Sequence, residues 1–441
     1  MKSIFLSSVF LIFLVSGFIS PFVLGLGYIW VDLVVPQRLA YSIINQMPLS
    51  FIIFIATFIA YILLDRKNIP KINGALVLLV LFTIWISMTT TWAFVPDAAF
   101  SKWNWAVKSV GFGIFVPFLF RSRVQIESAF AVINFSAASL YISIGIRTFI
   151  DGGGYGISTA GNTGLNESST LSLICTMLIP INLYFSKNSL LFGDNNKSKI
   201  LYYSLILFST STSIGTFART GFVSMLALSV FLFLGYKEKR IRLLILMIIF
   251  ALFISIIVPD AWISRMSTME SDTLDESALQ RLAAWAWTLD FVADFPFGGG
   301  FDVYRINQGV YFGTEIRGRA FHNIFFEVLG EQGYLGLFLY LSLYIWVLIN
   351  LYRLEKSTKN IPDLHWIYML SRFLFMSFVV YAVGGLFVGI AYQPIFYYFL
   401  GLTISLVQHF NRYSQDIHRP RLEKVSVESI ERVRCSPKTG Q

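Results

Sequence analysis

Long apolar runs separated by short polar connections dominate this chain of 441 residues. Each run has about 20 residues, the length that an α-helix needs to cross a hydrocarbon layer roughly 30 Å thick. The runs are continuously apolar rather than alternating, which favours helices over a membrane barrel. We therefore predict an all-α, polytopic integral membrane protein with about 12 transmembrane helices. The expected spans are 3–36, 45–64, 74–93, 105–120, 124–147, 168–186, 199–217, 220–236, 241–258, 323–352, 364–389 and 392–410.

The first run leaves two topologies open. A single helix over residues 3–36 would be about 50 Å long, too long for one crossing, and Pro21 predicts a break. Either this run crosses once and adds a re-entrant or interfacial piece, or it makes two short crossings and the N-terminus lies outside. No small-residue cleavage site follows the apolar start, so we expect an uncleaved first helix rather than a removed signal peptide.

Basic residues concentrate in every second connection from residue 45 onward, which places those connections in the cytoplasm. The segments near 93–105, 148–167, 217–220 and 259–321 are then on the outer side, and with a single crossing over residues 3–36 both termini are cytoplasmic. We predict a membrane domain over 1–410 and a polar, disordered cytoplasmic tail over 411–441. The basic connections contain Arg66, Lys67, Lys71, Arg121, Arg123, Lys187, Lys197, Lys199, Lys237, Lys239, Arg240, Arg242, Arg353, Lys356 and Lys359.

Composition supports the membrane class and removes others. The chain is 56% hydrophobic and 13% charged, whereas soluble domains carry about 25% charged residues. The net charge of +9 follows the membrane topology, so no nucleic-acid partner is predicted. Cys175 lies in an apolar run and Cys435 in the tail, which excludes a disulfide framework and a cysteine zinc site.

One large outer loop, over residues 258–322, is inserted between two spans. It contains a carboxylate-rich run over 270–276 and a glycine run over 298–300, and it ends at His322. A loop rich in arginine that closes on a titratable base is typical of an enzyme acting at the membrane surface on an anionic, lipid-linked substrate. Its arginines are Arg265, Arg281, Arg305, Arg317 and Arg319.

Two arginines are candidate phosphate ligands. Arg219, in SIGTFARTGF, is expected at the outer end of a span. It either snorkels to the headgroups or sits at the mouth of a cavity, where its planar fork can bind phosphate. Arg281 begins an amphipathic pattern that ends at Pro296. We expect that helix on the outer membrane surface with Trp285 and Trp287 at headgroup level, and whether Arg281 points into a site stays open.

The glycine run has two interpretations. Its backbone N–H groups could cradle a phosphate, or it could form a flexible turn. Glu327 and Glu331 are expected below membrane level in the span after the loop. Buried carboxylates need partners, and we expect them to hold the outer arginines.

His322 is the candidate general base, because histidine titrates near neutral pH and can take a proton from an attacking hydroxyl. The alternative is a structural or helix-capping histidine. Arg317 and Arg319 are close in the sequence, and we expect their charge to disfavour the protonated form of His322.

Three motifs occur in order: ARTGF, RLAAWAWTLDFVADFPFGGGF and FHNIFFEVLGEQGYLG. Together they resemble the O-antigen ligase and polymerase superfamily of bacterial inner-membrane proteins, over roughly residues 160–350. The segment PQRLAY is similar to the subgroup found with exopolysaccharide and exosortase systems. The stretch STAGNTGLNESSTLSL matches the family only loosely and brings Asn166 as a substrate-binding candidate.

The resemblance implies a glycosyltransferase that moves a glycan from undecaprenyl diphosphate to a hydroxyl of a glycan, lipid or protein acceptor on the periplasmic side. Arg219 and Arg281 would bind the diphosphate and stabilise its growing charge, and His322 would be the general base. Arg317 and Arg319 join Asn166 as substrate-binding candidates. No metal or other cofactor is expected, although the carboxylates over 272–276 leave a metal ion as an alternative. Direct attack by the acceptor would invert the anomeric carbon.

Ligase and polymerase cannot be separated from the sequence, because both use this chemistry. A transporter or flippase for lipid-linked sugars would instead need charged residues inside several spans and broken helices near the midplane, for which Lys108 is the main candidate. A non-catalytic scaffold would tolerate replacement of Arg219 and His322.

Overall fold

The computed structural model describes residues 2–40, 43–65, 69–153, 165, 167–235 and 276–434, with backbone only at 43–44 and 417–434. Helices coincide with every predicted span inside these ranges, whereas the span at 241–258 lies outside them. The N-terminal half contains α1 (Lys2–Gly17), α2 (Pro21–Val34), α3 (Pro36–Leu39), α4 (Leu49–Ala60), α5 (Gly74–Thr91), α6 (Pro96–Leu119), α7 (Arg123–Asp151) and α8 (Ser168–Asn188). The remainder contains α9 (Asn196–Gly215), α10 (Arg219–Gly235), α13 (Glu276–Asp294), α14 (Ile324–Thr358), α15 (His365–Gly385) and α16 (Pro394–Arg434).

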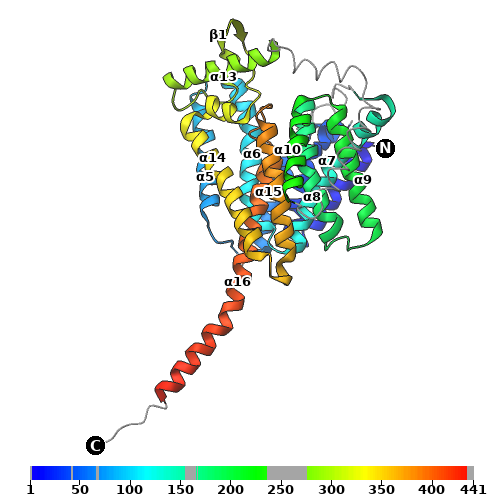
Figure 1. Cartoon of the computed structure of the whole chain (residues 1–441), viewed down its shortest axis with the longest axis vertical. Helices are drawn as coiled ribbons and strands as arrows, with labels where there is room; N and C mark the ends of the chain where they lie inside the picture. The colour runs from blue at the N-terminus through cyan, green and yellow to red at the C-terminus, as the bar shows by residue number, and fades with distance from the viewer. Residues whose placement is uncertain are drawn as a thin grey trace, which may run out of the picture.

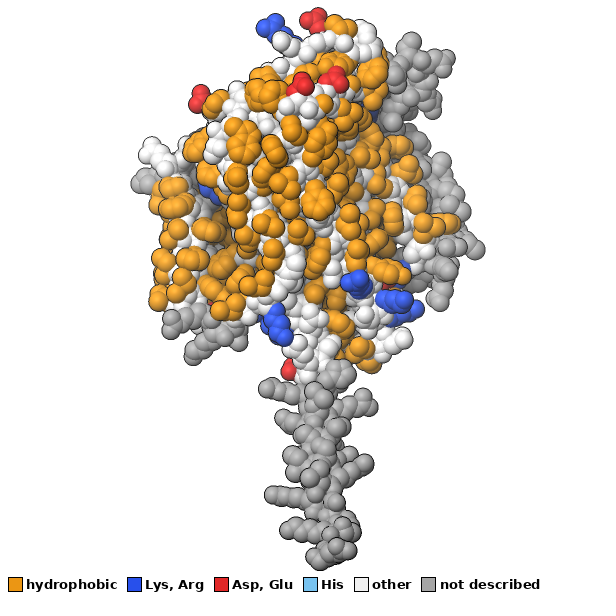
Figure 2. Space-filling model, turned by 90° about the vertical axis from the view of Figure 1, so that its left-hand side faces the viewer, with side chains coloured by type: hydrophobic (Ala, Val, Ile, Leu, Met, Phe, Trp, Pro, Cys, Tyr) orange, Lys and Arg blue, Asp and Glu red, His pale blue; other side chains and the backbone are white. Residues whose placement is uncertain are grey.

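The helices form a bundle whose lateral surface is apolar. Figure 2 shows hydrophobic side chains over the middle of one face, with most charged side chains toward its two ends. Five helical segments are long and apolar enough to cross a membrane: α5, α7, α8, α14 and Pro362–Gly385, which contains α15. These features confirm a helical membrane protein, while the number of crossings and the side on which each connection lies stay predictions.

The predicted break in the first apolar run is confirmed. α1 ends at Gly17 and α2 begins at Pro21, where a proline needs no backbone donor because it occupies the first helical turn. The two helices pack closely, since a Cβ on Gly17 would lie 2.0 Å from the Leu24 side chain.

α14 is interrupted at Gly333, whose φ of 67° and ψ of −169° are not helical. This break leaves the carbonyls of Gly330 and Glu331 free for the segment that follows α13: Gly299 N–H donates to Gly330 O (3.0 Å) and Gly300 N–H to Glu331 O (2.9 Å). In return, Tyr334 N–H donates to Pro296 O (3.0 Å). We call this backbone pairing between residues 296–300 and the break at Gly333 the glycine clip. It fixes α13 across one end of the bundle (Figure 1), which we call the α13 end.

The loop region also contains a β-hairpin, a local addition to the all-α fold that the sequence patterns did not predict. β1 (Gln308–Tyr311) pairs antiparallel with β2 (Thr314–Arg317) through a turn in which Phe312 and Gly313 have positive φ. Such a turn matches the twist of a two-stranded ribbon. Ile316 is buried against α13 in a small second core, and Tyr311 packs against the same core, so the hairpin is held by apolar contacts that its short, mainly polar sequence does not reveal.

The expected disorder of the tail is not what the backbone shows. α16 continues from the buried core as one helix to Arg434 (Figure 1). Low hydrophobicity prevents a segment from forming a core, but a helix needs only its own backbone hydrogen bonds and suitable helix formers, and the tail contains several Arg and Glu residues. Residues 435–441 lie outside the described residues.

Replacing Gly333 with alanine should destabilise the protein by about 3 kcal/mol, because the residue has a conformation that side chains resist and its Cβ would lie 2.3 Å from Pro296 O. The thermal unfolding midpoint of the purified protein in detergent measures this. Gly111→Ala on α6 is the control, since nothing lies within 4 Å of its Cβ position, and it should remain within about 1 kcal/mol of wild type. Equal midpoints for the two variants would contradict the role of the glycine clip.

Candidate functional site

Arg219 stands at the first position of α10, directly after a tight reversal. α9 ends at Gly215, and Phe217 takes a left-handed conformation (φ 52°) that turns the chain. Gly221 then lets α10 approach α9 and α8, since a Cβ there would lie 2.7 Å from Ser213 O and 3.0 Å from the Ser172 Cβ. The ARTGF motif is therefore a packing device that holds a half-buried Arg219 at a helix start.

Arg281 is half-buried on α13, and the tryptophans that follow it connect this helix to the residues around His322. Trp285 Nε1 donates to Phe321 O (2.7 Å), and its ring stacks on Phe326 at 5.1 Å. Trp287 is 8% exposed, inside the small core beneath α13. Both side chains therefore pack inward instead of toward the headgroups as expected: Trp285 finds an acceptor in Phe321 and a ring partner in Phe326, and Trp287 stacks on Phe291 of α13.

His322 occupies a strained position between two fixed neighbours. Its φ of 47° is left-handed, a conformation that non-glycine residues adopt at a cost and that often marks functional sites. On one side, the Phe321 carbonyl accepts the Trp285 hydrogen bond. On the other, Asn323 caps α14 by accepting from Phe325 N (2.8 Å) and Phe326 N (3.3 Å). The capping role thus belongs to Asn323, which leaves the His322 ring for other contacts.

The surroundings of His322 favour its neutral form. Burial lowers the pKa of His322, and the positive charge of Arg281 lowers it further, whereas Glu167 and Glu327 raise it. The expected direction is confirmed, but the expected cause is wrong, because Arg281 supplies the charge assigned to Arg317 and Arg319. The structure therefore brings Arg281 and His322 together.

Arg317 and Arg319 have exposed side chains on the hairpin side of the loop. Arg317 pairs with Gln308 across the two strands. The backbone of Arg319 is held by Asn307, which donates to its carbonyl at 2.7 Å and accepts from its N–H at 2.8 Å. Asn166, Arg265, Asp272 and Asp275 lie outside the described residues.

A pair of glycines at the end of α15 connects the helix of Arg219 to that of His322. A Cβ on Gly384 would lie 2.4 Å from both Leu173 of α8 and Ser224 of α10, and one on Gly385 would lie 2.6 Å from Ile324 at the start of α14. Three helices therefore pack on two adjacent residues. This arrangement brings the first turns of α8, α10 and α14 to the same end of the bundle as α13.

The glycine run is not a phosphate cradle. The N–H groups of Gly298, Gly299 and Gly300 donate to the carbonyls of Phe295, Gly330 and Glu331 at 2.9–3.0 Å. A backbone N–H that is already bonded to a carbonyl has no hydrogen left for an anion. These residues serve the glycine clip, so any diphosphate ligand must come from side chains.

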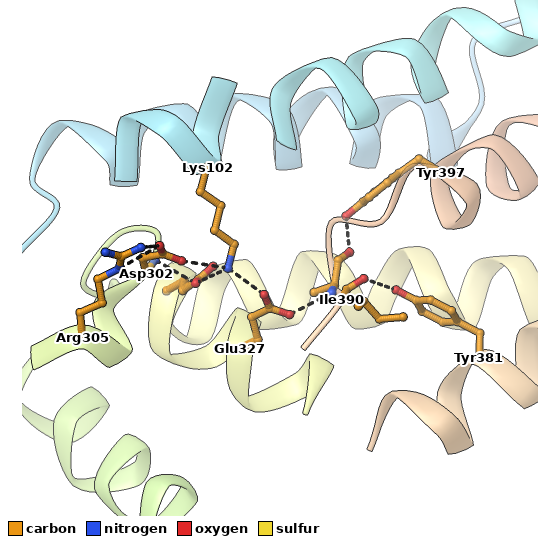
Figure 3. A network of polar contacts seen from close by, with 9 residues as sticks. Lys102, Asp302, Arg305, Glu327, Tyr381, Ile390 and Tyr397 are labelled. Atoms are coloured by element: carbon orange, nitrogen blue, oxygen red, sulfur yellow. Dashed lines mark hydrogen bonds and ion pairs between the residues drawn. The ribbon is translucent and has the colours of Figure 1, made fainter. Parts of the chain in front are cut away.

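An ion cluster connects α6, the loop after α13 and the first part of α14 (Figure 3). Lys102 Nζ on α6 contacts Glu327 Oε1 (2.7 Å), Glu331 Oε1 (2.6 Å) and Asp302 Oδ1 (3.5 Å). Arg305 holds the other oxygen of Asp302 at 2.9 Å. The expectation that Glu327 and Glu331 hold the outer arginines is corrected in part, because their shared partner is Lys102 and only Asp302 is bound by an arginine.

Sequence reasoning missed two charged residues of this region. Lys102 lies near the start of α6. The one observation that could have pointed to it is that Glu327 and Glu331, if buried, need a cation. Glu167 directly precedes α8, so its acidic position at a predicted helix start could have drawn attention. Its exposed carboxylate accepts from Thr170 (3.0 Å).

Comparison with protein families supports the membrane assignment and adds a function class. Residues 204–341 match the model of the O-antigen ligase family. This part of the chain is therefore similar to the O-antigen ligase family. The match contains Arg219, Arg281 and His322. Residues 1–190, which include Lys102 and Glu167, match a family of unknown function, DUF5935. A search of curated proteins found no match. The match supports a membrane protein of the glycan ligase and polymerase type.

Replacing Lys102 with methionine should cost about 3 kcal/mol of stability, because it leaves buried carboxylates without their cation. Lys199→Met on α9 is the control: Lys199 also forms an ion pair, with Asp194 at 2.7 Å, but both side chains are largely exposed, so the loss should stay under about 1 kcal/mol. Thermal midpoints in the same detergent measure both. A Lys102→Met midpoint no lower than that of the control would show that the cluster does not hold the α13 end together.

Proposed function

We propose that this protein transfers a glycan from undecaprenyl diphosphate to an acceptor hydroxyl at the periplasmic face of the bacterial inner membrane. The observation that supports this most is the pairing of Arg281 with His322, a half-buried base biased toward its neutral form, inside the region that matches the O-antigen ligase family. In this proposal the α13 end faces the periplasm and both termini are cytoplasmic.

The reaction follows from the chemistry of these side chains. The acceptor hydroxyl gives its proton to a ring nitrogen of His322 while its oxygen attacks the anomeric carbon. The bond from that carbon to the phosphate oxygen breaks, and its electron pair leaves with the lipid diphosphate. Attack from the face opposite the leaving group inverts the anomeric carbon.

Arg281 and Arg219 bind and neutralise the diphosphate in this scheme. A guanidinium stays charged and forms paired hydrogen bonds with phosphate oxygens, and stabilising the charge that grows on the leaving group contributes strongly to such reactions. With two cations assigned to this task, we propose a metal-independent transferase. Arg317, Arg319 and Asn166 are proposed as further substrate contacts, and the exposed side chains of the two arginines suit a ligand that extends away from the bundle.

Ligase and polymerase activities share this mechanism and differ in the acceptor. We propose ligase activity, the transfer of a finished glycan chain to a terminal acceptor. We also propose that the protein is a member of the exopolysaccharide-associated subgroup. A transporter receives less support, although α14 is broken and charges are buried. Gly333 lies nine residues after the start of α14, or about 14 Å along it. The hydrogen bonds of the glycine clip already occupy the backbone groups around this break at the α13 end.

Loss of the base should abolish transfer. His322→Ala should reduce activity by about 10²–10⁴-fold, and Arg219→Lys and Arg281→Lys should remain poor because an ammonium cannot reproduce the fork. The measurement is the lipid-linked glycan pool and final conjugate in a deletion strain complemented with each variant at matched membrane levels. Long lipid-linked chains without conjugate indicate a ligase, whereas single repeat units indicate a polymerase. Wild-type products from all three variants would exclude this site.

The pH profile tests the protonation state of the base. Since burial and Arg281 lower the pKa of His322 from its ordinary 6.5, His322 stays neutral at pH 7 and gains its proton only at lower pH. The acidic limb of kcat/KM, measured with a purified lipid-linked donor, should therefore have its midpoint below pH 6.5. Arg281→Gln removes one cause of the shift, so any residual activity should show a midpoint at higher pH. A wild-type midpoint above 6.5 would contradict the assignment.

A further inference from the structure

We propose that Glu327, fixed by Lys102, is a positioning residue that supports His322 when the histidine takes up the acceptor proton. This inference rests on the proposed function for its catalytic meaning, but the coupling between the two side chains can be measured without activity. The ion cluster then does more than fasten the α13 end: it supplies the carboxylate that faces the base.

Glu327 is held from two sides in the state expected of a carboxylate. The residue is 5% exposed. Its Oε1 contacts Lys102 Nζ at 2.7 Å, and its Oε2 accepts a hydrogen bond from Ala391 N–H at 2.9 Å (Figure 3). Both partners are donors, so both oxygens act as acceptors.

The backbone connects Glu327 to Asn323, the residue that follows His322. Glu327 N–H donates to Asn323 O (2.8 Å), closing the first turn of α14. Asn323 follows His322 and caps the same turn. Because Lys102 and Ala391 immobilise the Glu327 side chain, they also fix the turn from which His322 projects.

The charges that face His322 come from three elements. Arg281 on α13 opposes its protonation, whereas Glu167 before α8 and Glu327 on α14 favour it. Glu167 is exposed, so water and salt weaken its effect, while a buried charge acts through a lower dielectric. Glu327 is therefore the carboxylate best placed to offset Arg281 when His322 becomes an imidazolium.

Glu331 provides the matched control. It lies one helical turn further along α14, is fully buried, and binds the same ammonium at 2.6 Å. Its Oε1 also accepts from Asp302 N–H at 2.9 Å, so it serves the loop, and of the two glutamates Glu327 is the one that raises the pKa of His322. Replacing either glutamate damages the cluster, but only one replacement changes the field at the histidine.

The test compares Glu327→Gln with Glu331→Gln in full-length protein reconstituted in nanodiscs. Diethyl pyrocarbonate acylates neutral imidazole, so the rate of His322 acylation against pH, followed by peptide mass spectrometry, gives its protonation midpoint. Removing the negative charge of Glu327 should move that midpoint to lower pH, and Glu331→Gln should leave it in place. In the transfer assay, Glu327→Gln should move the acidic limb the same way and lower kcat by about 10- to 100-fold, the range seen when a residue that orients a functional group is lost.

An unchanged midpoint in Glu327→Gln, or an equal shift in Glu331→Gln, would reduce Glu327 to a structural residue and overturn the inference. If Glu327→Gln does not fold, Glu327→Asp and Glu331→Asp replace the pair. Each substitution keeps the negative charge but shortens the side chain by one methylene. We expect Glu327→Asp to lower the His322 protonation midpoint by less than Glu327→Gln would, and Glu331→Asp to leave the midpoint unchanged. Full transfer by His322→Ala would instead refute the proposed function, while the acylation midpoints would still decide the coupling.

Discussion

A helix that is interrupted inside a membrane protein exposes backbone carbonyls that water cannot reach. In α14 the interruption at Gly333 frees the carbonyls of Gly330 and Glu331, and the glycines after α13 satisfy them through their N–H groups. An unsatisfied backbone group in such surroundings costs several kcal/mol, so the two segments stabilise each other only when both are present. α13 lies across the bundle because of this pairing, and Trp285 consequently reaches the carbonyl beside His322.

The ion cluster meets the glycine clip at a single residue. The backbone carbonyl of Glu331 accepts from Gly300 N–H, and its carboxylate pairs with Lys102 and accepts from Asp302 N–H. Replacing a buried ion pair with apolar residues is often neutral for stability, so stability alone does not explain why charges are kept here. A fixed carboxylate next to a base explains it better, since apolar packing could immobilise the first turn of α14 but could not supply a field.

Local sequence patterns predicted what depends on neighbouring residues. Apolar run length located the helices, Pro21 located a break, and the spacing around Arg281 predicted an amphipathic helix that α13 confirms. The residues of the candidate site followed from their chemistry and from motif order. Long-range partners were beyond this reasoning: Lys102 lies 225 residues from Glu327, and no periodicity relates them. The same limit left the role of the glycine run open and explains the errors about the tryptophans and the charges acting on His322, because each depended on which distant segment approaches.

Backbone strain occurs at one candidate residue, His322, and two residues before another, Arg219. Phe217 and His322 both have left-handed backbone without being glycine, and each lies within two residues of the start of a helix, α10 or α14. A glycine would relieve the strain in either place. At Phe217 the strain accompanies a tight reversal that places Arg219, whereas at His322 the strained residue is itself the candidate base. His322 lies before α14, so helical geometry does not dictate the direction of its side chain, although the rigid helix that follows holds the turn in place. The side chain can therefore project toward Arg281 while Asn323 caps the helix. The glycine clip and the ion cluster hold the two sides of that turn, which is why a strained histidine can persist there.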